Sequence, residues 1–560
     1  MDRHRALWCI GEKGVVAREA AVADVEVLVV GAGPVGLTLA CELRRRGVRC
    51  RVIDRLPAPQ PFAKAVGIQP RTLEIWDRMG IVREALEAAV PLRGQLLYVN
   101  GVQQARIELT LPPDVPYRFA ALPQNDTERL LEAVLARWGG HVERGTELLG
   151  FEQDADGVRV RLALPTGEAE GTSAGFLVGC DGAHSVVRKT LGLGFAGGAF
   201  PEEYMLGDVE VDWDLPPGYA VRSMHQSDGR TDDLLVCIPL PGHHRYRMSM
   251  LVPPALSREP QQPDDEGVSH GLEDGPVPGL ADIQAVLDRL APRPATATAL
   301  RWSSVFRISH RLVDRYGEGR VFVAGDAAHI HPPTGAQGMN TGIQDAYNLA
   351  WKLAMAVRST ASEGLLSSYH AERRPVGEEV VQRTVRHAGE GVQADPDDPS
   401  TLIRREAQLL VGYRGSPIVG TDHPPRQGPA PGDRAPDCGG LRYELAAFPS
   451  RLFDVLRGDE HTLLLYADGE DQLASCADVA EAARGRAHGQ LTVRVIVAPG
   501  LRTDGLPLPV VQDGRDAFRQ SYGAHGGEGF LIRPDGYLGL RPARASDPEL
   551  LAQLALTFRT

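Results

Sequence analysis

Residues 25–54, VEVLVVGAGPVGLTLACELRRRGVRCRVID, decide the fold of this chain. An apolar, β-branched run (25–30) leads into a glycine-rich turn (31–36), which is followed by a segment with apolar residues at helical spacing (37–46). A second strand-like run occupies 49–54. A strand, a helix and a strand in this order predict a β-α-β unit with a parallel sheet, which indicates the α/β class.

The turn carries three glycines at the spacing of a dinucleotide-binding loop. Gly31 would permit the tight turn, Gly33 would let the backbone approach a pyrophosphate, and Gly36 would let the helix pack closely on the strand. Asp54 stands eighteen residues after Gly36, at the end of the second strand, where it could accept hydrogen bonds from both ribose hydroxyls. These residues predict a bound dinucleotide without distinguishing FAD from NAD.

A distant segment favours FAD. GDAAH (325–329), HPP (331–333) and GAQGMN (335–340) join a predicted strand at 320–324 to a long helix predicted from about 340 to 357. Asp326 would lie beside a ligand hydroxyl, as a ribityl chain requires. The glycine-rich turn would open the helix N-terminus, which concentrates about half a positive charge and could stabilise an anionic reduced flavin.

Three segments, 29–55, 177–192 and 321–354, resemble the signatures of the class A (single-component) FAD-dependent aromatic hydroxylases, the family of p-hydroxybenzoate and phenol hydroxylases. Within this family the chain is most similar to the bacterial aromatic polyketide monooxygenases, some of which act in antibiotic biosynthesis. The resemblance implies a Rossmann-like FAD-binding domain interleaved with an antiparallel-sheet substrate domain, plus a C-terminal thioredoxin-like domain.

The resemblance also implies roles for individual residues. Pro332 is expected near the reactive edge of the flavin, and Asp181 is expected to serve both FAD and the nicotinamide donor. Lys64 stands where the family usually has Arg, a change that keeps the charge but loses the planar fork. The implied cofactor-binding residues are Gly31, Gly33, Pro34, Gly36, Asp54, Arg55, Lys64, Gln124, Asp181, Gly325, Asp326, Pro332, Gly338, Met339 and Asn340.

The implied reaction is hydroxylation of a small-molecule aromatic substrate, a polycyclic phenol of polyketide type. NADPH or NADH would reduce FAD, and O₂ would then give a flavin C4a-hydroperoxide that transfers oxygen to the ring. Two alternatives stay open at this point. One is Baeyer–Villiger insertion of oxygen into a polyketide ketone on the same scaffold, and the other is an FAD-binding protein without turnover.

Candidate substrate residues lie in the middle of the chain. Tyr246 and Met248 alternate on one predicted strand, and Trp302 lies near the next one. The alternative interpretation is core packing, because apolar alternation in strands usually marks a core.

The domain organisation follows from these segments and from Pro/Gly-rich stretches. The expected parts are a flexible N-terminal arm (1–24), an FAD-binding domain (25–200 and 301–400, with substrate-domain strands inserted near 90–125), a substrate-binding domain (201–300), a linker (401–440) and a thioredoxin-like C-terminal domain lacking CxxC (441–560).

Composition narrows the functional class. The 560 residues are 43% apolar and 24% charged, as in globular proteins. A net charge of −13 offers no basic field for nucleic acid or an anionic membrane. Seven cysteines without a CxxC pair favour a reducing compartment and indicate no metal site. Without a signal-like or membrane-length apolar run, we expect a cytoplasmic monomer or homodimer.

Overall fold

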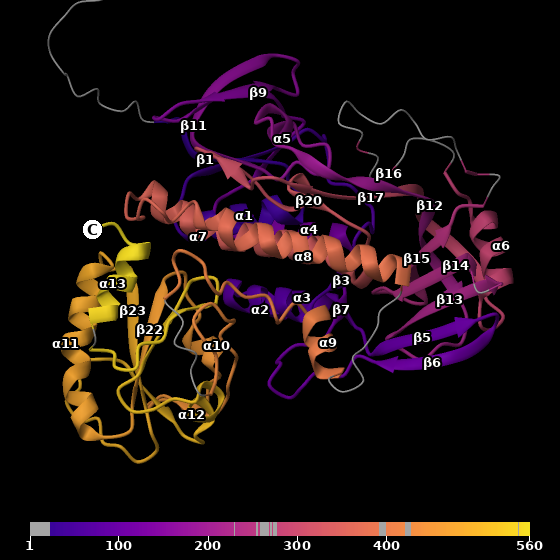
Figure 1. The fold of residues 1–560 in the computed structure, drawn as a ribbon. Helices are drawn as coiled ribbons and strands as arrows, with labels where there is room; N and C mark the ends of the chain where they lie inside the picture. Colours follow the sequence, from indigo (N-terminus) through magenta and orange to yellow (C-terminus); the bar gives the residue numbers. More distant parts are fainter. Residues whose placement is uncertain are drawn as a thin grey trace, which may run out of the picture.

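The computed structural model describes residues 23–228, 230–253, 256–257, 268, 271–272, 277–390, 399–420, 427–546 and 548–560. Of the expected N-terminal arm, residues 1–22 lie outside the described residues. The described chain forms three main sheets with helices packed between and around them (Figure 1).

The first sheet contains the predicted β-α-β unit. Its central strands β2, β1, β11 and β19 are parallel, and α1 (Pro34–Arg45) connects β1 to β2. The strands, in sheet order, are β18 (Gly317–Glu318), β19 (Val321–Val323), β11 (Ala169–Gly179), β1 (Val25–Val30), β2 (Cys50–Asp54) and β8 (Val142–Arg144), with β9 (Glu147–Gln153) and β10 (Val158–Ala163) extending from β11.

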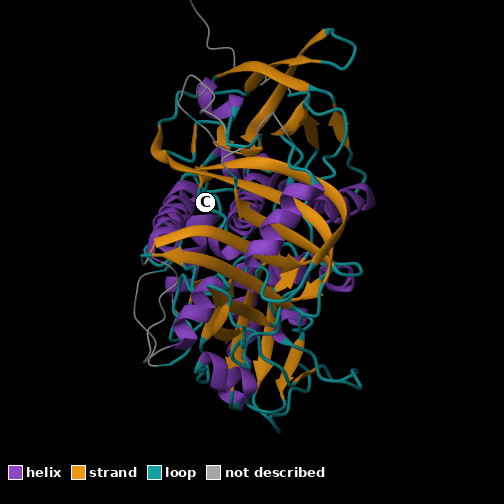
Figure 2. Cartoon of the chain, turned by 90° about the vertical axis from the view of Figure 1, so that its right-hand side faces the viewer, coloured by secondary structure: helices purple, strands orange, loops and turns teal. Residues whose placement is uncertain are grey.

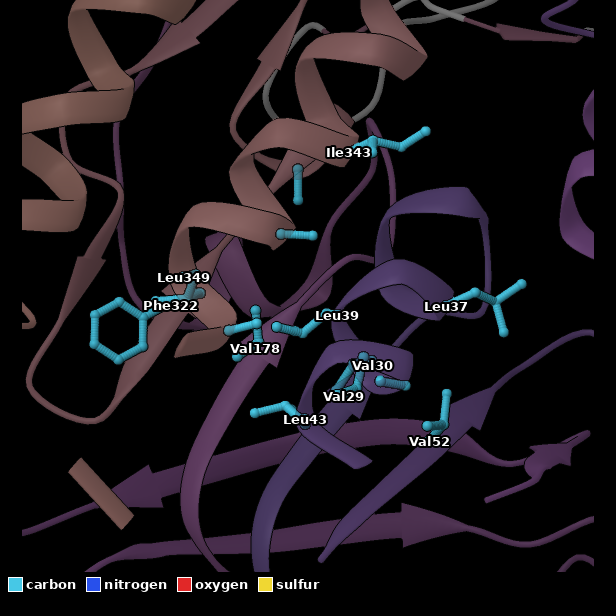
Figure 3. Close-up of a cluster of buried hydrophobic side chains, with 14 of the residues drawn as sticks. Val29, Val30, Leu37, Leu39, Leu43, Val52, Val178, Phe322, Ile343 and Leu349 are labelled. Atoms are coloured by element: carbon cyan, nitrogen blue, oxygen red, sulfur yellow. The ribbon is translucent and has the colours of Figure 1, made fainter. Parts of the chain in front are cut away.

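Helices α1 and α7 (Gly338–Val357) share one buried cluster with strands of this sheet. Leu37, Leu39 and Leu43 of α1 belong to this cluster with Ile343 and Leu349 of α7, as Figure 3 shows. The predicted long helix therefore packs on the helix that follows the glycine-rich turn. This packing brings two sequence motifs about 300 residues apart into one layer.

The second sheet is mostly antiparallel, and only β13 and β5 pair in parallel. Helix α6 (Leu280–Leu290) covers one of its faces, and Figure 2 views the molecule from the side of this sheet. In sheet order the strands are β16 (Gly271–Leu272), β17 (Thr296–Val313), β12 (Phe195–Asp212), β15 (Arg245–Leu251), β14 (Arg230–Pro239), β13 (Tyr219–Ser227), β5 (Gly94–Val99) and β6 (Val102–Glu108); β20 (His329–Ile330) pairs with β17.

The third sheet belongs to the C-terminal region. Strands β22 and β23 are parallel and joined by α11 (Glu470–Arg486), whereas β25 runs antiparallel to β22 and leads through β26 to α13 (Pro548–Thr557). A β-α-β unit followed by a β-β-α unit is compatible with the thioredoxin-like assignment, which stays a prediction. The strands are β21 (Leu441–Arg442), β24 (Val510–Asp513), β23 (Leu491–Val497), β22 (His461–Ala467), β25 (Gly529–Ile532) and β26 (Leu538–Leu540).

The remaining elements connect these sheets. They are α2 (Pro70–Met79), α3 (Val82–Ala88), α4 (Gln124–Arg137), α5 (Val186–Thr190), α8 (Ser368–Glu390), α9 (Pro399–Glu406), α10 (Leu452–Val455) and α12 (Ala517–Tyr522), with the short strands β3 (Gly67–Ile68), β4 (Val90–Pro91) and β7 (Ala120–Ala121) and the 3-10 turns η1 (Gly325–Ala327) and η2 (Thr334–Ala336).

Candidate cofactor and substrate site

Four predicted cofactor segments meet at one edge of the first sheet. Gly31 follows β1, Asp54 ends β2, Asp181 follows β11, and Gly325 follows β19. Because these strands are parallel, their carboxyl ends lie together, which is where open α/β sheets bind ligands.

The three glycines of the turn have different surroundings. Gly31 has φ +99°, and a side chain on it would overlap the carbonyl oxygen of Cys180, while a side chain on Gly36 would overlap the carbonyl oxygen of Gly31. Gly33, in contrast, has no atom within 4 Å of where a Cβ would stand. Gly31 and Gly36 therefore shape the turn, whereas Gly33 leaves open space at the N-terminus of α1.

The N-terminus of α1 is free to face an anion. Pro34 occupies the first turn, and no side chain caps the helix. The first amides of a helix have no intrahelical acceptor, so they present donors and a partial positive charge to a phosphate.

Asp54 is oriented by backbone amides. Its Oδ2 accepts a hydrogen bond from the N–H of Ala32 at 2.8 Å, and its Oδ1 accepts one from the N–H of Leu56 at 2.8 Å. The Arg144 guanidinium lies 3.7 Å from Oδ2, and the side chain of Arg55 is exposed next to it in the chain. A carboxylate has about four acceptor positions, so Asp54 keeps capacity for a ribose.

Gln124 joins α4 to the segment that contains Lys64. Its Oε1 accepts from the N–H of Ala65 at 3.2 Å, and its own N–H donates to the carbonyl of Ala65 at 2.8 Å. Its Nε2 donates to Glu128 Oε1 at 2.9 Å. Burial raises the pKa of Glu128 to about 7. Lys64 itself is half-buried in this segment.

The carboxylate of Asp181 serves the protein itself. It accepts hydrogen bonds from Ser185 Oγ at 2.6 Å and from the N–H groups of Val186 and Val187 at 2.7 and 3.2 Å, which caps α5. Burial raises the pKa of this carboxyl. Direct contact of Asp181 with FAD or a nicotinamide stays a prediction, since the structure shows a carboxylate that fixes the loop after β11.

The turn after β19 presents a carboxylate that has no partner among the residues described by the structure. The N–H of Gly325 donates to Asp345 Oδ2 at 3.1 Å, and this glycine has φ +63°. Asp326, next to it, is half-buried and makes no hydrogen bond or ion pair with any residue that the structure describes. Such a carboxylate fits the hydroxyls of a ribityl chain.

A buried ion network fixes this turn to α7 and α8. His329 Nε2 and Asp345 Oδ2 are 2.7 Å apart, and Arg373 Nε donates to Asp345 Oδ1 at 2.7 Å. Burial alone would raise the pKa of Asp345, but Arg373 and His329 hold it below its usual value. His329 therefore supports the turn as a structural hydrogen-bonding residue.

At the start of α7, side chains and backbone have separate roles. Asn340 Oδ1 accepts from the N–H of Gln69 at 3.0 Å, and its Nδ2 donates to the carbonyls of Gly67 and Ala336 at 2.9 and 2.8 Å. This side chain thus clamps β3 to the turn before α7. The backbone at Gly338 and Met339 begins a helix without a side-chain cap, so its first amides can face a flavin ring.

Pro332 is buried just before this turn. Its carbonyl oxygen lies 2.9 Å from His331 Nδ1. Taken together, the open space at Gly33, the two uncapped helix N-termini and the unpartnered Asp326 fit FAD. The individual residue contacts with FAD stay predictions.

The predicted substrate residues lie on different faces of the second sheet. Met248 has an exposed fraction of 0%, and Tyr246 packs edge-on against Trp213 with ring centroids 5.3 Å apart. Both belong to the cluster that includes Ile283 and Val286 of α6. The alternative interpretation, core packing beneath α6, therefore describes both side chains.

Trp302 lies on the opposite face. Its ring stacks on Phe62, from the segment of Lys64, with centroids 5.0 Å apart and planes at 25°. Ile238 of β14 packs with Ala63 and Val66 of the same segment. This face, and not the α6 face, adjoins the part of the chain predicted to contact FAD.

Sequence reasoning missed three residues on this side of the sheet. Phe62 carries no local signal, because only its stacking on Trp302 reveals it. Arg222 and Arg247 did have a local sequence signal, because a charged residue within a predicted strand between apolar residues is unusual.

The comparisons with known proteins agree with this architecture. Residues 24–384 match the family described as FAD binding domain. A flavin-dependent monooxygenase of Mycobacteroides abscessus is 36% identical over 455 residues, covering 79% of this chain and 88% of that protein. The 6-methylpretetramide 4-monooxygenase of Streptomyces rimosus is 35% identical over 553 residues, covering 94% of this chain and 93% of that protein.

A solved structure is similar over nearly the whole chain. The ternary complex of aklavinone-11 hydroxylase with FAD and aklavinone has a TM-score of 0.74 and 27% identity, covering 95% of this chain and 98% of that one. Within the described residues, no helix has the length and apolar character needed to cross a membrane.

Proposed function

Because this chain belongs to the flavin-dependent monooxygenases that carry this FAD binding domain, we propose that it hydroxylates a polycyclic aromatic phenol of polyketide type with NADPH or NADH and O₂. The names of two similar proteins support this substrate class, since they act on 6-methylpretetramide and aklavinone. The observation that carries the proposal is the stacking of Phe62 on Trp302, because it joins the FAD-binding part to the sheet face that would hold the substrate.

Each predicted cofactor-binding residue has a role in this proposal. Gly31, Gly33, Pro34 and Gly36 shape the pyrophosphate site, Asp54 and Arg55 hold the adenosine part, and Asp326 with Gly325 holds the ribityl chain. Lys64, Gln124, Asp181, Pro332, Gly338, Met339 and Asn340 shape or contact the surroundings of the ring. FAD, once reduced, supplies activated oxygen to the substrate. The backbone amides at the start of α7 favour negative charge on the reduced cofactor.

The protein's further task is to keep water from the reacting atoms. The aromatic and aliphatic side chains around Trp302, namely Phe62, Phe200, Tyr204, Leu206, Phe306 and Ile308, form an apolar surface on the cofactor side of the sheet. An apolar surface at this position orients a flat substrate by stacking and excludes solvent.

The test uses purified holoenzyme, a panel of hydroxylated naphthalenes, anthraquinones and tetracyclic phenols, and ¹⁸O₂. We expect at least one compound to stimulate NADPH or NADH oxidation and to gain one labelled oxygen on a ring carbon, located by NMR. Lactone formation would instead support Baeyer–Villiger insertion. Nucleotide oxidation that no compound changes, without labelled product, would contradict the proposal and favour an FAD-binding protein without turnover.

The cellular setting is part of the same proposal. The cysteines Cys41, Cys50, Cys180, Cys237, Cys438 and Cys476 are free thiols, which suits the reducing cytoplasm that also supplies NADPH and NADH. We propose a cytoplasmic monomer or homodimer, which light scattering of the purified protein distinguishes.

A further inference from the structure

Two arginines of the second sheet, one buried and one half-buried, have no acidic partner among the described residues. Arg247 of β15 has an exposed fraction of 8%, and its Nε is buried without a hydrogen-bond acceptor. Arg222 of β13 is half-buried, and its Nε is buried in the same way. Neither guanidinium forms an ion pair with any residue that the structure describes.

Several other buried arginines of this chain are paired with carboxylates. Arg373 pairs with Asp345 at 2.7 Å, and Arg533 pairs with Glu372 at 2.6 Å. Burial of a cation is unfavourable unless an opposite charge lies close by. Burial indeed lowers the pKa of Arg247 to about 10 and also lowers the pKa of Arg222. An anion that is not part of the chain would remove this cost.

Both arginines point to the cofactor side of the sheet. Arg247 pairs with Ile238 and Arg222 pairs with Val236, which are two residues apart on β14 and therefore share a face. Met248 and Cys237, the next residues along these strands, face α6. With two strand spacings and a two-residue offset, the Cα atoms of Arg222 and Arg247 are roughly 12 Å apart, within reach of one ligand.

The aromatic surface around Trp302 lies on the same face. Trp302 pairs with Asp208 of β12, and Asp208 pairs with Arg247 of β15, so the three side chains form one cross-strand row. Asp208 itself is neutralised by Arg245, with 2.5 Å between Oδ2 and Nη2. Tyr204 of β12 lies on the same face, and burial raises the pKa of its hydroxyl, as does the charge of Glu202. The charge of Arg222 opposes these two effects, which places its guanidinium near Tyr204.

We propose that Arg222 and Arg247 bind an ionised oxygen substituent of the aromatic substrate, a carboxylate or a phenolate. This inference rests on the proposed function and narrows its substrate class to anionic aromatic compounds. The planar guanidinium suits such a group, because two parallel N–H donors match two oxygen acceptors. The pair would fix which end of the substrate lies along the sheet and which end approaches the cofactor.

The test compares ligands that share a ring system, with holoenzyme and flavin absorbance as the signal for binding. The probes are 3-hydroxy-2-naphthoate, with a carboxylate, 1-nitro-2-naphthol, whose phenol is ionised at neutral pH, and neutral 2-naphthol. We expect wild type to bind at least one anionic probe more tightly than 2-naphthol. Tighter binding of the naphthoate indicates a carboxylate ligand, and tighter binding of the nitronaphthol indicates a phenolate.

Substitution of each arginine then tests whether Arg222 and Arg247 cause the preference for the anionic probe. Arg247→Met and Arg222→Met should weaken binding of the preferred anionic probe about tenfold to a hundredfold, with 2-naphthol nearly unchanged. The matched control is Arg301→Met, because Arg301 is an exposed arginine of the same sheet that pairs with Glu210 at 2.7 Å. This variant should bind the anionic probe and 2-naphthol with wild-type affinity. Arg247→Met should also melt no lower than wild type, because it removes an uncompensated buried charge.

Four results would overturn this inference. The first two are equal affinity of wild type for anionic and neutral probes, and unchanged probe affinity in both arginine variants. The third is unfolding or a lowered Tm of Arg247→Met, which would make the guanidinium structural. The fourth is an effect of both substitutions on the KM for NADPH alone, which would assign the cations to the nucleotide. Because binding is read without turnover, failure of oxygenation alone would contradict only the proposed function.

Discussion

Two glycines three positions apart provide the sharpest test at the scale of single residues. Gly33 has φ −75° and open space where a side chain would stand, whereas a side chain on Gly36 would overlap the carbonyl oxygen of Gly31. Gly33→Ala should therefore fold like wild type, and its apoprotein should keep the same Tm. Its methyl group would occupy the place of the pyrophosphate and should weaken FAD binding at least about tenfold, the value of one lost hydrogen bond to a charged group.

Gly36→Ala is the matched control for this prediction. Its new methyl group would overlap backbone of the same turn, so it should be destabilised whether or not FAD is present. Differential scanning fluorimetry of apoprotein and FAD titration separate the two variants. Wild-type FAD affinity in Gly33→Ala would contradict the assignment of the pyrophosphate site.

Glu128 gives a pH-dependent prediction. Burial raises the pKa of this carboxyl from 4.5 to about 7, so the native state holds the proton between these values while the unfolded state releases it. The free energy of unfolding of the apoprotein should therefore fall as the pH rises from about 4.5 to about 7, by at most about 3 kcal/mol from this group.

Urea unfolding of wild type and Glu128→Gln at pH 5 and pH 8 isolates this contribution. The amide cannot ionise, so the variant should gain stability relative to wild type as the pH rises. A difference between the two proteins that stays constant with pH would contradict the raised pKa.

At the scale of elements, α7 is held in place by Asp345. This residue joins α7 to the Gly325 amide, to His329 and to Arg373 of α8. Asp345→Asn would leave the buried Arg373 without its counter-charge, which should lower the free energy of unfolding by about 3–5 kcal/mol. It should also release the turn that carries Asp326 and so weaken FAD binding.

The control for Asp345→Asn is Asp288→Asn, at an exposed position of α6. Chemical unfolding and FAD titration of both variants check the prediction. Equal stability of the two variants would show that the Asp345 network does not hold the turn.

Elements with a local cause could be predicted from the sequence. The glycine-rich turn, α1 and α7 follow from residue types at short spacing, and the structure places them in one layer. The orientation of β15 could not be predicted. The alternation of residues along β15 places Tyr246 and Met248 on one face of the strand and Arg247 on the other. Which face is buried beneath a helix depends on the packing of α6, which no local pattern in β15 specifies.

The parallel pairing of β5 with β13 also could not be predicted from local sequence. These strands are joined only after more than 100 residues, and no local pattern of either strand specifies the other as its neighbour. The parts of the site that belong to a sequence motif, such as Gly31 and Asp326, could be predicted from the sequence. For Arg222 and Arg247, the sequence shows only that charged residues stand within strands. Their burial without a partner among the described residues follows from tertiary packing and could not be predicted.

At the scale of the whole molecule, Arg533 fastens the C-terminal region to the FAD-binding part. It lies between β25 and β26 and contacts both oxygens of Glu372 in α8, at 2.6 and 2.9 Å, as well as Asp535. Arg533→Ala would leave Glu372 with Lys352 as its remaining cationic partner, at 2.7 Å. We expect a loss of about 3–5 kcal/mol and a separate unfolding transition of the C-terminal region in calorimetry.

Arg541→Ala serves as the comparison, because Arg541 pairs with Glu528 inside the C-terminal region at 3.1 Å. It should lower the stability of that region without uncoupling it from the rest. A single transition at the wild-type temperature in Arg533→Ala would contradict the role of this contact.

Segments hundreds of residues apart are expected to bind one FAD at the carboxyl ends of β2, β1, β11 and β19. The most direct measurement is titration of apoprotein with FAD for wild type and Asp326→Ala. Asp326 has no partner among the described residues, so the variant should keep the wild-type Tm as apoprotein. We predict one FAD per wild-type chain and about tenfold to a hundredfold weaker binding in the variant. Wild-type affinity in Asp326→Ala, or a wild-type chain that takes up no FAD, would contradict this account.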